Sequence, residues 1–266
     1  KTVKVKLGET TVPINFYVYN ATDNDELEKN MPEAFTGNST FRDDGKLVFV
    51  NIRVGLIKGK TTNDNLRKVH GILQHELNHI YQQFCRGCEY GHTGLNSVAI
   101  SNLISDKEEE YVLGTIAYIG NYSERQGFCN ELYVNLMDSL RDGIIPNCTN
   151  QSAYIWLNSL QKAYQYLLKN KDNPKLAIAI KRFKDSKNLR LYNIGSKDNL
   201  EKTGRKHLSD EDKWAYHKFK TLANNTIQKF EDEIRVTIGK VVMDATDEGI
   251  MPQISDTDVW SMFFVK

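Results

Sequence analysis

The spacing of hydrophobic residues changes at about Asn63, and this change constrains the fold more than any other feature of the sequence. Before it, apolar residues alternate with polar ones or cluster as in β-strands, in residues 3–7, 12–19 and 46–54. After it, they recur at spacings of three and four, which places them along one stripe of an α-helix: Leu66, Val69, Leu73, Leu77, Ile80 and Phe84. Thr62 or Asn63 can cap this helix, and Gly87 follows its end.

The rest of the chain is predicted to be helical, over about 106–119, 123–142, 151–168, 174–183 and 209–242. Ser123 with Gln126 three residues later forms a capping-box signature, which predicts a helix start, and Gly143 and Pro146 predict its end. The composition shifts near Pro146. We therefore expect an α+β fold, with an N-terminal core in residues 1–145 and a mostly helical lobe of unassigned role in residues 146–266.

Composition excludes several classes of protein. The chain has 266 residues, with 35 Lys and Arg against 34 Asp and Glu, and 40% of its residues are hydrophobic. A disordered chain or a protein that coats nucleic acid would show a larger net charge, and the Lys-rich stretch 181–206 also contains acids. No apolar run approaches the roughly 18 residues of a membrane helix, so we expect a soluble protein. The start at Lys1 leaves the compartment open, because a removed leader would be invisible.

The predicted helix after Asn63 contains the motif H-E-x-x-H, as His75, Glu76 and His79. Residues four apart lie one turn apart on the same helix face, so both imidazoles can bind one tetrahedral zinc ion while the glutamate reaches the water on it. At about 100° per residue the two histidines point away from the leucine stripe. We expect the stripe to pack into the protein and the histidines to face a cleft.

Two histidines need a third ligand, and the residues leave several candidates. Glu124 and Glu131 lie seven residues apart on the helix after Ser123, so both share one face, and Glu124 also lies in the first turn, where the helix dipole favours a carboxylate. His92 in the following loop is a third candidate. Cys85 can ligate in principle, but Cys85 and Cys88 are more simply interpreted as ordinary thiols or a local bridge. The extended motif H-E-x-x-H-x-x-G-x-x-H is absent, because Gln82 and Cys85 stand where it has Gly and His.

Residues 75–82, followed by a helix that begins at residues 122–128, resemble the gluzincin group of zincin-like metallopeptidases. In that group the third ligand is a glutamate on the next helix, in an E-x-x-A setting. The resemblance implies that His75, His79 and Glu124 bind one catalytic zinc ion and that Glu76 is the catalytic acid and base. It covers about residues 46–142, and it departs from the group at Gly127, where alanine is usual, and in the long gap between the two helices.

This resemblance and the motif predict a zinc-dependent peptidase acting on a peptide or protein substrate. Glu76 would take a proton from water activated by the zinc and pass it to the leaving amine. A developing oxyanion needs a further donor, and the candidates are Tyr118, Tyr122, Tyr133 and His92. The strand 46–54 could present an edge for an extended substrate, or could be sheet core.

Two other functions remain open from the sequence. The chain could be a non-catalytic structural or interaction module that retains the fold, for example in a phage-type assembly. It could also be a self-processing or single-target enzyme whose helical lobe docks one protein partner. The intact motif argues against simple loss of function, because all three chemical residues are present. No nucleic-acid or membrane partner is expected.

Overall fold

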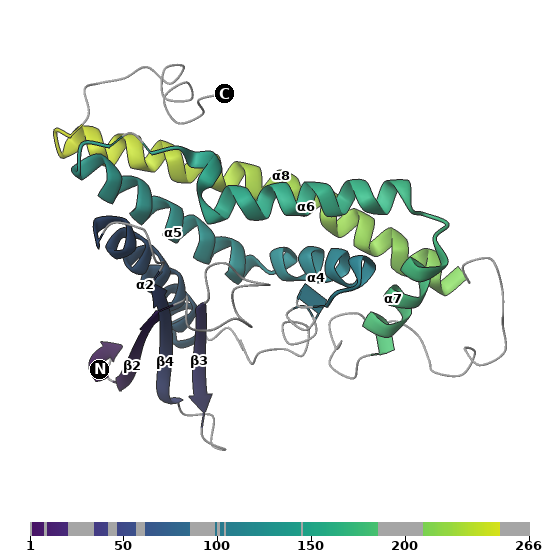
Figure 1. Cartoon of the computed structure of the whole chain (residues 1–266), viewed down its shortest axis with the longest axis horizontal. Coiled ribbons are helices and arrows are strands. Elements are labelled where there is room, and N and C mark those ends of the chain that lie inside the picture. Colours follow the sequence, from purple (N-terminus) through teal and green to yellow (C-terminus); the bar gives the residue numbers. More distant parts are fainter. Residues whose placement is uncertain are drawn as a thin grey trace. The chain divides into compact units, whose positions relative to one another are not determined.

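The computed structural model describes residues 2–7, 10–20, 35–41, 47–56, 62–85, 99, 102–103, 105–144, 146–185 and 210–250. Figure 1 shows the arrangement of the elements. The strands are β1 (Thr2–Leu7), β2 (Thr10–Asn20), β3 (Phe35–Phe41) and β4 (Leu47–Leu56). The helices are α2 (Thr62–Cys85), α4 (Glu108–Gly120), α5 (Tyr122–Arg141), the short η2 (Cys148–Asn150), α6 (Ser152–Lys169), α7 (Pro174–Asp185) and α8 (Asp210–Asp247).

The four strands form one small sheet in the order β1-β2-β4-β3. β2 runs parallel to β4, while β1 and β3 run antiparallel to their neighbours. β4 therefore has a paired strand on each side. Because its backbone hydrogen-bonding groups face β2 and β3, it cannot serve as the open edge suggested for residues 46–54.

The expected α+β class is wrong, because the described chain is mostly helical and does not show a zincin-like α+β core. The sheet is confined to residues before 57, and every described element from Thr62 onward is a helix. The strand patterns in the first part of the sequence led us to expect a larger contribution of β-structure than the described chain has. The long helical segments determine the class instead.

The chain divides into two units that do not follow its order. One unit contains Lys1–Cys88, Gln126–Cys148 and Thr237–Lys266, and the other contains Glu89–Arg125 and Thr149–Val236. These differ from the contiguous segments 1–145 and 146–266 suggested by the sequence, whose separate roles stay a prediction. Helices α5 and α8 each contribute to both units.

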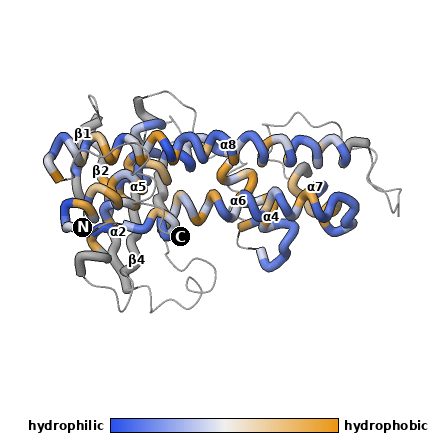
Figure 2. Tube along the Cα trace, turned by 90° about the horizontal axis from the view of Figure 1, so that it is seen from above, coloured by the Kyte–Doolittle hydropathy of each residue, from blue (hydrophilic) through white to orange (hydrophobic). Residues whose placement is uncertain are grey.

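The second unit is built around α4. This helix is apolar on nearly all sides, and its buried residues are Val112, Leu113, Gly114, Thr115, Ile116, Ala117 and Ile119. Its first turn carries three consecutive glutamates, which the helix dipole favours at this end. α6 and α7 contact α4, and Figure 2 shows that α8 is mostly hydrophilic along its length. A helix surrounded in this way forms the core of the unit.

The ends of α5 follow from local chemistry. Asn121 is the C-cap residue of α4. Its side-chain oxygen accepts a hydrogen bond from the backbone N–H of Ser123 at 3.0 Å. Asn121 is therefore the N-cap of α5, a position that the sequence predicted for Ser123. At the other end, Gly143 adopts a φ of 71° and donates to Leu140, while Ile144 donates to Ser139. This is the Schellman arrangement, and it confirms the predicted stop at Gly143.

Candidate metal centre

Within the first unit, α2 and α5 pack as an antiparallel pair. Three side-chain contacts define how the two helices are aligned: Arg67 with Asp142, His70 with Asp138, and His75 with Glu131. The residue numbers of these pairs rise along α2 and fall along α5, as they must in an antiparallel pair. His70 Nδ1 lies 2.6 Å from Asp138 Oδ2, and His75 Nδ1 lies 3.6 Å from Glu131 Oε2. This alignment places residues 127–131 of α5 beside His75.

Glycines allow the two helices to approach closely. A Cβ atom on Gly127 of α5 would lie 2.6 Å from His75 Nε2, and one on Gly71 of α2 would lie 2.4 Å from the side-chain oxygen of Asn135. No real Cβ atom tolerates such distances. Gly127 is therefore the position at which the imidazole of His75 lies against the α5 backbone, which explains why alanine is missing there.

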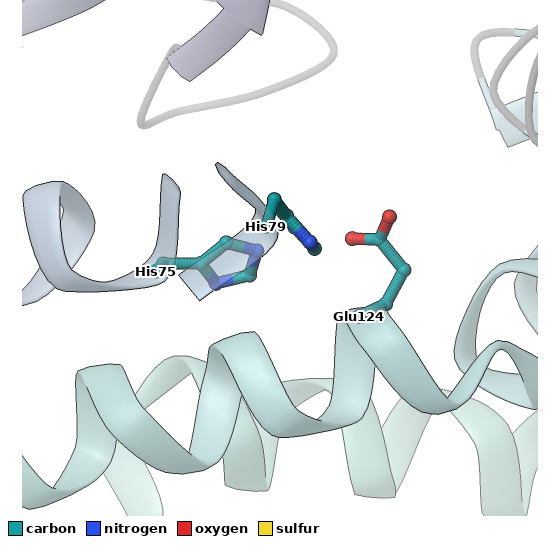
Figure 3. Close-up of side chains that lie close together, drawn as sticks. All are labelled: His75, His79 and Glu124. Atoms are coloured by element: carbon teal, nitrogen blue, oxygen red, sulfur yellow. The ribbon is translucent and has the colours of Figure 1, made fainter. Parts of the chain in front are cut away.

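His75, His79 and Glu124 form a group that could hold a metal ion. Each offers one ligand atom, and these atoms all lie within 4.8 Å of one another. Figure 3 shows the two imidazoles on one face of α2, with the carboxylate of Glu124 directed at His79. His75 and Glu124 are 6% and 8% exposed. A buried set of two imidazoles and one carboxylate suits a divalent transition metal.

The face of α2 that is buried is not the one the sequence predicted. Leu66 is 59% exposed, and Leu73 and Leu77 are half-buried, whereas Ile72, His75 and Gln82 are buried. The histidine face is covered by α5 because Gly71 and Gly127 open room for it there. The expectation that the leucine stripe packs into the protein is therefore wrong for these three leucines, and the cleft expected beside the histidines stays a prediction.

Aromatic contacts hold the ring of His75. The Phe128 ring lies edge-on to it, with centroids 4.7 Å apart and planes at 73°, and the His79 ring lies 4.8 Å away at 70°. With Gly127 beneath the ring and Glu131 beside Nδ1, His75 is enclosed by one face of α5. Sequence reasoning missed Phe128, although its spacing of three from Glu131 and four from Glu124 puts it on that face.

Arg125 anchors the start of α5, next to Glu124. Its buried guanidinium donates to the backbone oxygens of Ile119 and Gly120 at 2.9 and 3.0 Å, which are terminal carbonyls of α4, and to Glu233 of α8 at 2.9 Å. These bonds satisfy carbonyls that a helix end leaves without partners. No local sequence pattern indicates this role, because Glu233 lies 108 residues away.

The other predicted site residues are placed as follows. Glu76 is half-buried on α2, next to His75 in sequence. Glu131 lies beside His75 but is not a member of the three-residue group. His92, Cys88 and the side chain of Cys85 lie outside the described residues.

The tyrosines considered as oxyanion donors have other contacts. The Tyr133 hydroxyl donates to Asp244 at 2.6 Å, and this hydrogen bond, with burial, raises the pKa of Tyr133 to about 12. Tyr118 packs against Trp156, with ring centroids 5.2 Å apart. The ring of Tyr122 lies under the Arg125 guanidinium at 5.8 Å. Of the three, Tyr133 has its hydroxyl hydrogen engaged by a carboxylate, which removes it as a donor in this arrangement.

In the described part of the chain, Cys129 and Cys148 are buried and form no disulfide bond. Burial raises the pKa of the Cys148 thiol to about 12, so it stays protonated near neutral pH. A protonated thiol is neither a nucleophile nor a metal ligand. Cys148 therefore contributes to packing.

Comparisons of the chain with protein-family models, curated proteins and solved structures find no match. Among the described helices, none has the length and apolar character of a membrane span. The function is therefore inferred from the residues of the site.

Proposed function

We propose that the chain is a zinc-dependent peptidase whose metal is held by His75, His79 and Glu124. The observation that supports it is the buried group of two imidazoles and one carboxylate whose ligand atoms lie within 4.8 Å of one another. Three protein ligands of this kind leave a coordination position open, which is the pattern of catalytic rather than structural zinc sites. The chemistry of the motif, and not the fold, links it to gluzincin peptidases.

A zinc ion bound here would act as a Lewis acid that makes water more acidic and polarises the substrate carbonyl. Glu76 directly follows His75 on α2 and does not belong to the metal-binding group. Its carboxylate oxygen would accept the proton of the attacking water and return it to the leaving nitrogen. The two imidazoles must be neutral to offer lone pairs to the metal.

The test compares Glu76→Gln with the wild type and with Glu108→Gln, a matched change at an exposed glutamate of α4. Peptide hydrolysis is measured with a mixed library of unstructured peptides, and zinc content by elemental analysis. We expect Glu76→Gln to lower hydrolysis by about 10²–10⁴-fold while zinc stays near one per chain, because this is the usual contribution of a general base to the rate. Glu108→Gln should match the wild type in both.

Two results would contradict this proposal. A wild-type chain without stoichiometric metal would remove its basis. A chain that binds zinc but cleaves no peptide would favour the alternative of a non-catalytic structural or interaction module.

A further inference from the structure

Glu131 is a buried carboxylate beside the first histidine of the motif. It is 6% exposed, and its Oε2 atom lies 3.6 Å from His75 Nδ1. A carboxylate this deeply buried is costly unless a charged or hydrogen-bonding group compensates it. The ring nitrogen of His75 is such a group on the adjacent helix.

Glu131 and Glu124 share one face of α5 but meet different atoms. The group with ligand atoms within 4.8 Å contains Glu124, His75 and His79 and leaves Glu131 out. Glu131 instead faces the Nδ1 side of His75. Because the two nitrogens of an imidazole point in different directions, an Nδ1 directed at Glu131 leaves Nε2 for the metal.

We propose that Glu131 is a positioning residue that holds His75 in the tautomer with the hydrogen on Nδ1 and in the ring orientation that a metal requires. This inference rests on the proposed metal centre. Carboxylates behind metal-binding histidines act in this way, and losing them typically weakens metal affinity about 10–100-fold. The distance of 3.6 Å exceeds that of a hydrogen bond, and such contacts tighten when the site is loaded.

The neighbours of the ring support an orienting role over simple packing. Gly127 and Phe128 already fill the space around His75, the first beneath its plane and the second edge-on. Neither can distinguish one tautomer from the other, because neither offers an acceptor to Nδ1. Of the α5 side chains that contact the ring, Glu131 supplies that acceptor.

The experiment measures Zn²⁺ affinity by competition with a chelating dye, and the absorption spectrum with Co²⁺, for the full chain. Glu131→Gln should bind one ion per chain with about 10–100-fold lower affinity and keep the Co²⁺ bands of the wild type. Its melting temperature without metal should not fall, because a neutral amide removes a buried charge. Glu124→Gln should change the Co²⁺ spectrum itself, and Glu108→Gln should change nothing.

Each outcome decides the inference. Unchanged Zn²⁺ affinity in Glu131→Gln would overturn it, as would weaker binding together with a lower melting temperature without metal, because the loss of affinity would then follow from a folding defect. Loss of stoichiometric binding with an altered Co²⁺ spectrum would make Glu131 a ligand instead. If Glu131→Gln does not fold, Glu131→Asp replaces it and should bind more weakly than the wild type; equal affinity would overturn the inference. A wild-type chain that binds no metal would overturn both the proposed function and this inference. A wild-type chain that binds metal with the same affinity as Glu131→Gln would overturn the inference alone.

Discussion

At the scale of single residues, the sequence could identify the histidine pair but not its surroundings. His75, Glu76 and His79 follow from helical spacing within one segment. Glu124 and Glu131 are equivalent by that rule, because they lie seven residues apart on one helix. What separates them is the alignment of α5 against α2, set by contacts such as His70 with Asp138, 68 residues apart in sequence. No local pattern encodes that alignment.

Gly127 shows how a departure from a family pattern can have a structural cause. Replacing it with alanine would place a methyl group 2.6 Å from His75 Nε2. We expect Gly127→Ala to weaken zinc binding at least about tenfold and to lower the free energy of unfolding by about 1–3 kcal/mol, as overpacking does. Dye competition and urea unfolding measure the two effects.

The matched control is Gly239→Ala on α8, where a Cβ atom would meet nothing within 4 Å. It should leave zinc affinity unchanged and raise the free energy of unfolding by roughly 0.5–1 kcal/mol through helix propensity. Wild-type zinc affinity in Gly127→Ala would show that His75 does not lie against this backbone.

At the scale of elements, hydrophobic periodicity located the helices well. The predicted ranges 123–142 and 151–168 differ by a residue or so from α5 and α6. Hydrophobic periodicity did not predict which face of α2 is covered. It assigns the face with leucines to the core because leucine is more hydrophobic than histidine, and it takes no account of glycines that let another helix approach closely. The capping-box signature placed the N-cap of α5 at Ser123, although Asn121 has the same capping chemistry two residues earlier.

Tyr133 links α5 to α8 in a pH-dependent way. The hydrogen bond to Asp244 and burial raise the pKa of Tyr133 from 10.0 to about 12, because its ionised form would face a second negative charge. A pKa raised on folding means that the stabilisation is fully present below about pH 10 and is lost as the pH rises to about 12. We expect Tyr133→Phe to be about 1–2 kcal/mol less stable than the wild type at pH 7, with this difference shrinking above pH 10.

Urea unfolding at a series of pH values measures that difference. Asp244→Asn serves as the partner variant, because Tyr133→Phe should cost little more once the acceptor carboxylate is gone. A stability difference between wild type and Tyr133→Phe that stays constant from pH 7 to pH 12 would contradict this assignment.

At the scale of the whole molecule, the predicted fold class was wrong. The strand patterns lie in the first part of the sequence alone, whereas every described element from Thr62 onward is a helix. A single boundary near Pro146 also does not describe the two units, because one of them is formed by residues 1–88, 126–148 and 237–266. The third segment completes that unit. Ile238, Val241 and Ala245 of α8 are buried, and Glu248 accepts three hydrogen bonds from Arg141.

A fragment of residues 1–145 should therefore fail to fold cooperatively. It lacks these apolar side chains of α8, and a large one contributes about 1.5–3 kcal/mol when buried, against a total stability of roughly 5–15 kcal/mol. Thermal unfolding followed by near-ultraviolet circular dichroism measures this. A sharp transition in the fragment, together with the zinc affinity of the full chain, would establish residues 1–145 as an independent domain and contradict the expectation.

The metal content of the purified full chain tests the central claim most directly. Elemental analysis after dialysis against metal-free buffer should find about one zinc ion per chain in the wild type. His75→Ala and His79→Ala should lose it, Glu124→Gln should retain far less, and Glu108→Gln should match the wild type, because the first three remove donors from one buried group. A wild-type chain without stoichiometric metal, or equal metal content in His79→Ala, would show that these residues do not form a metal centre.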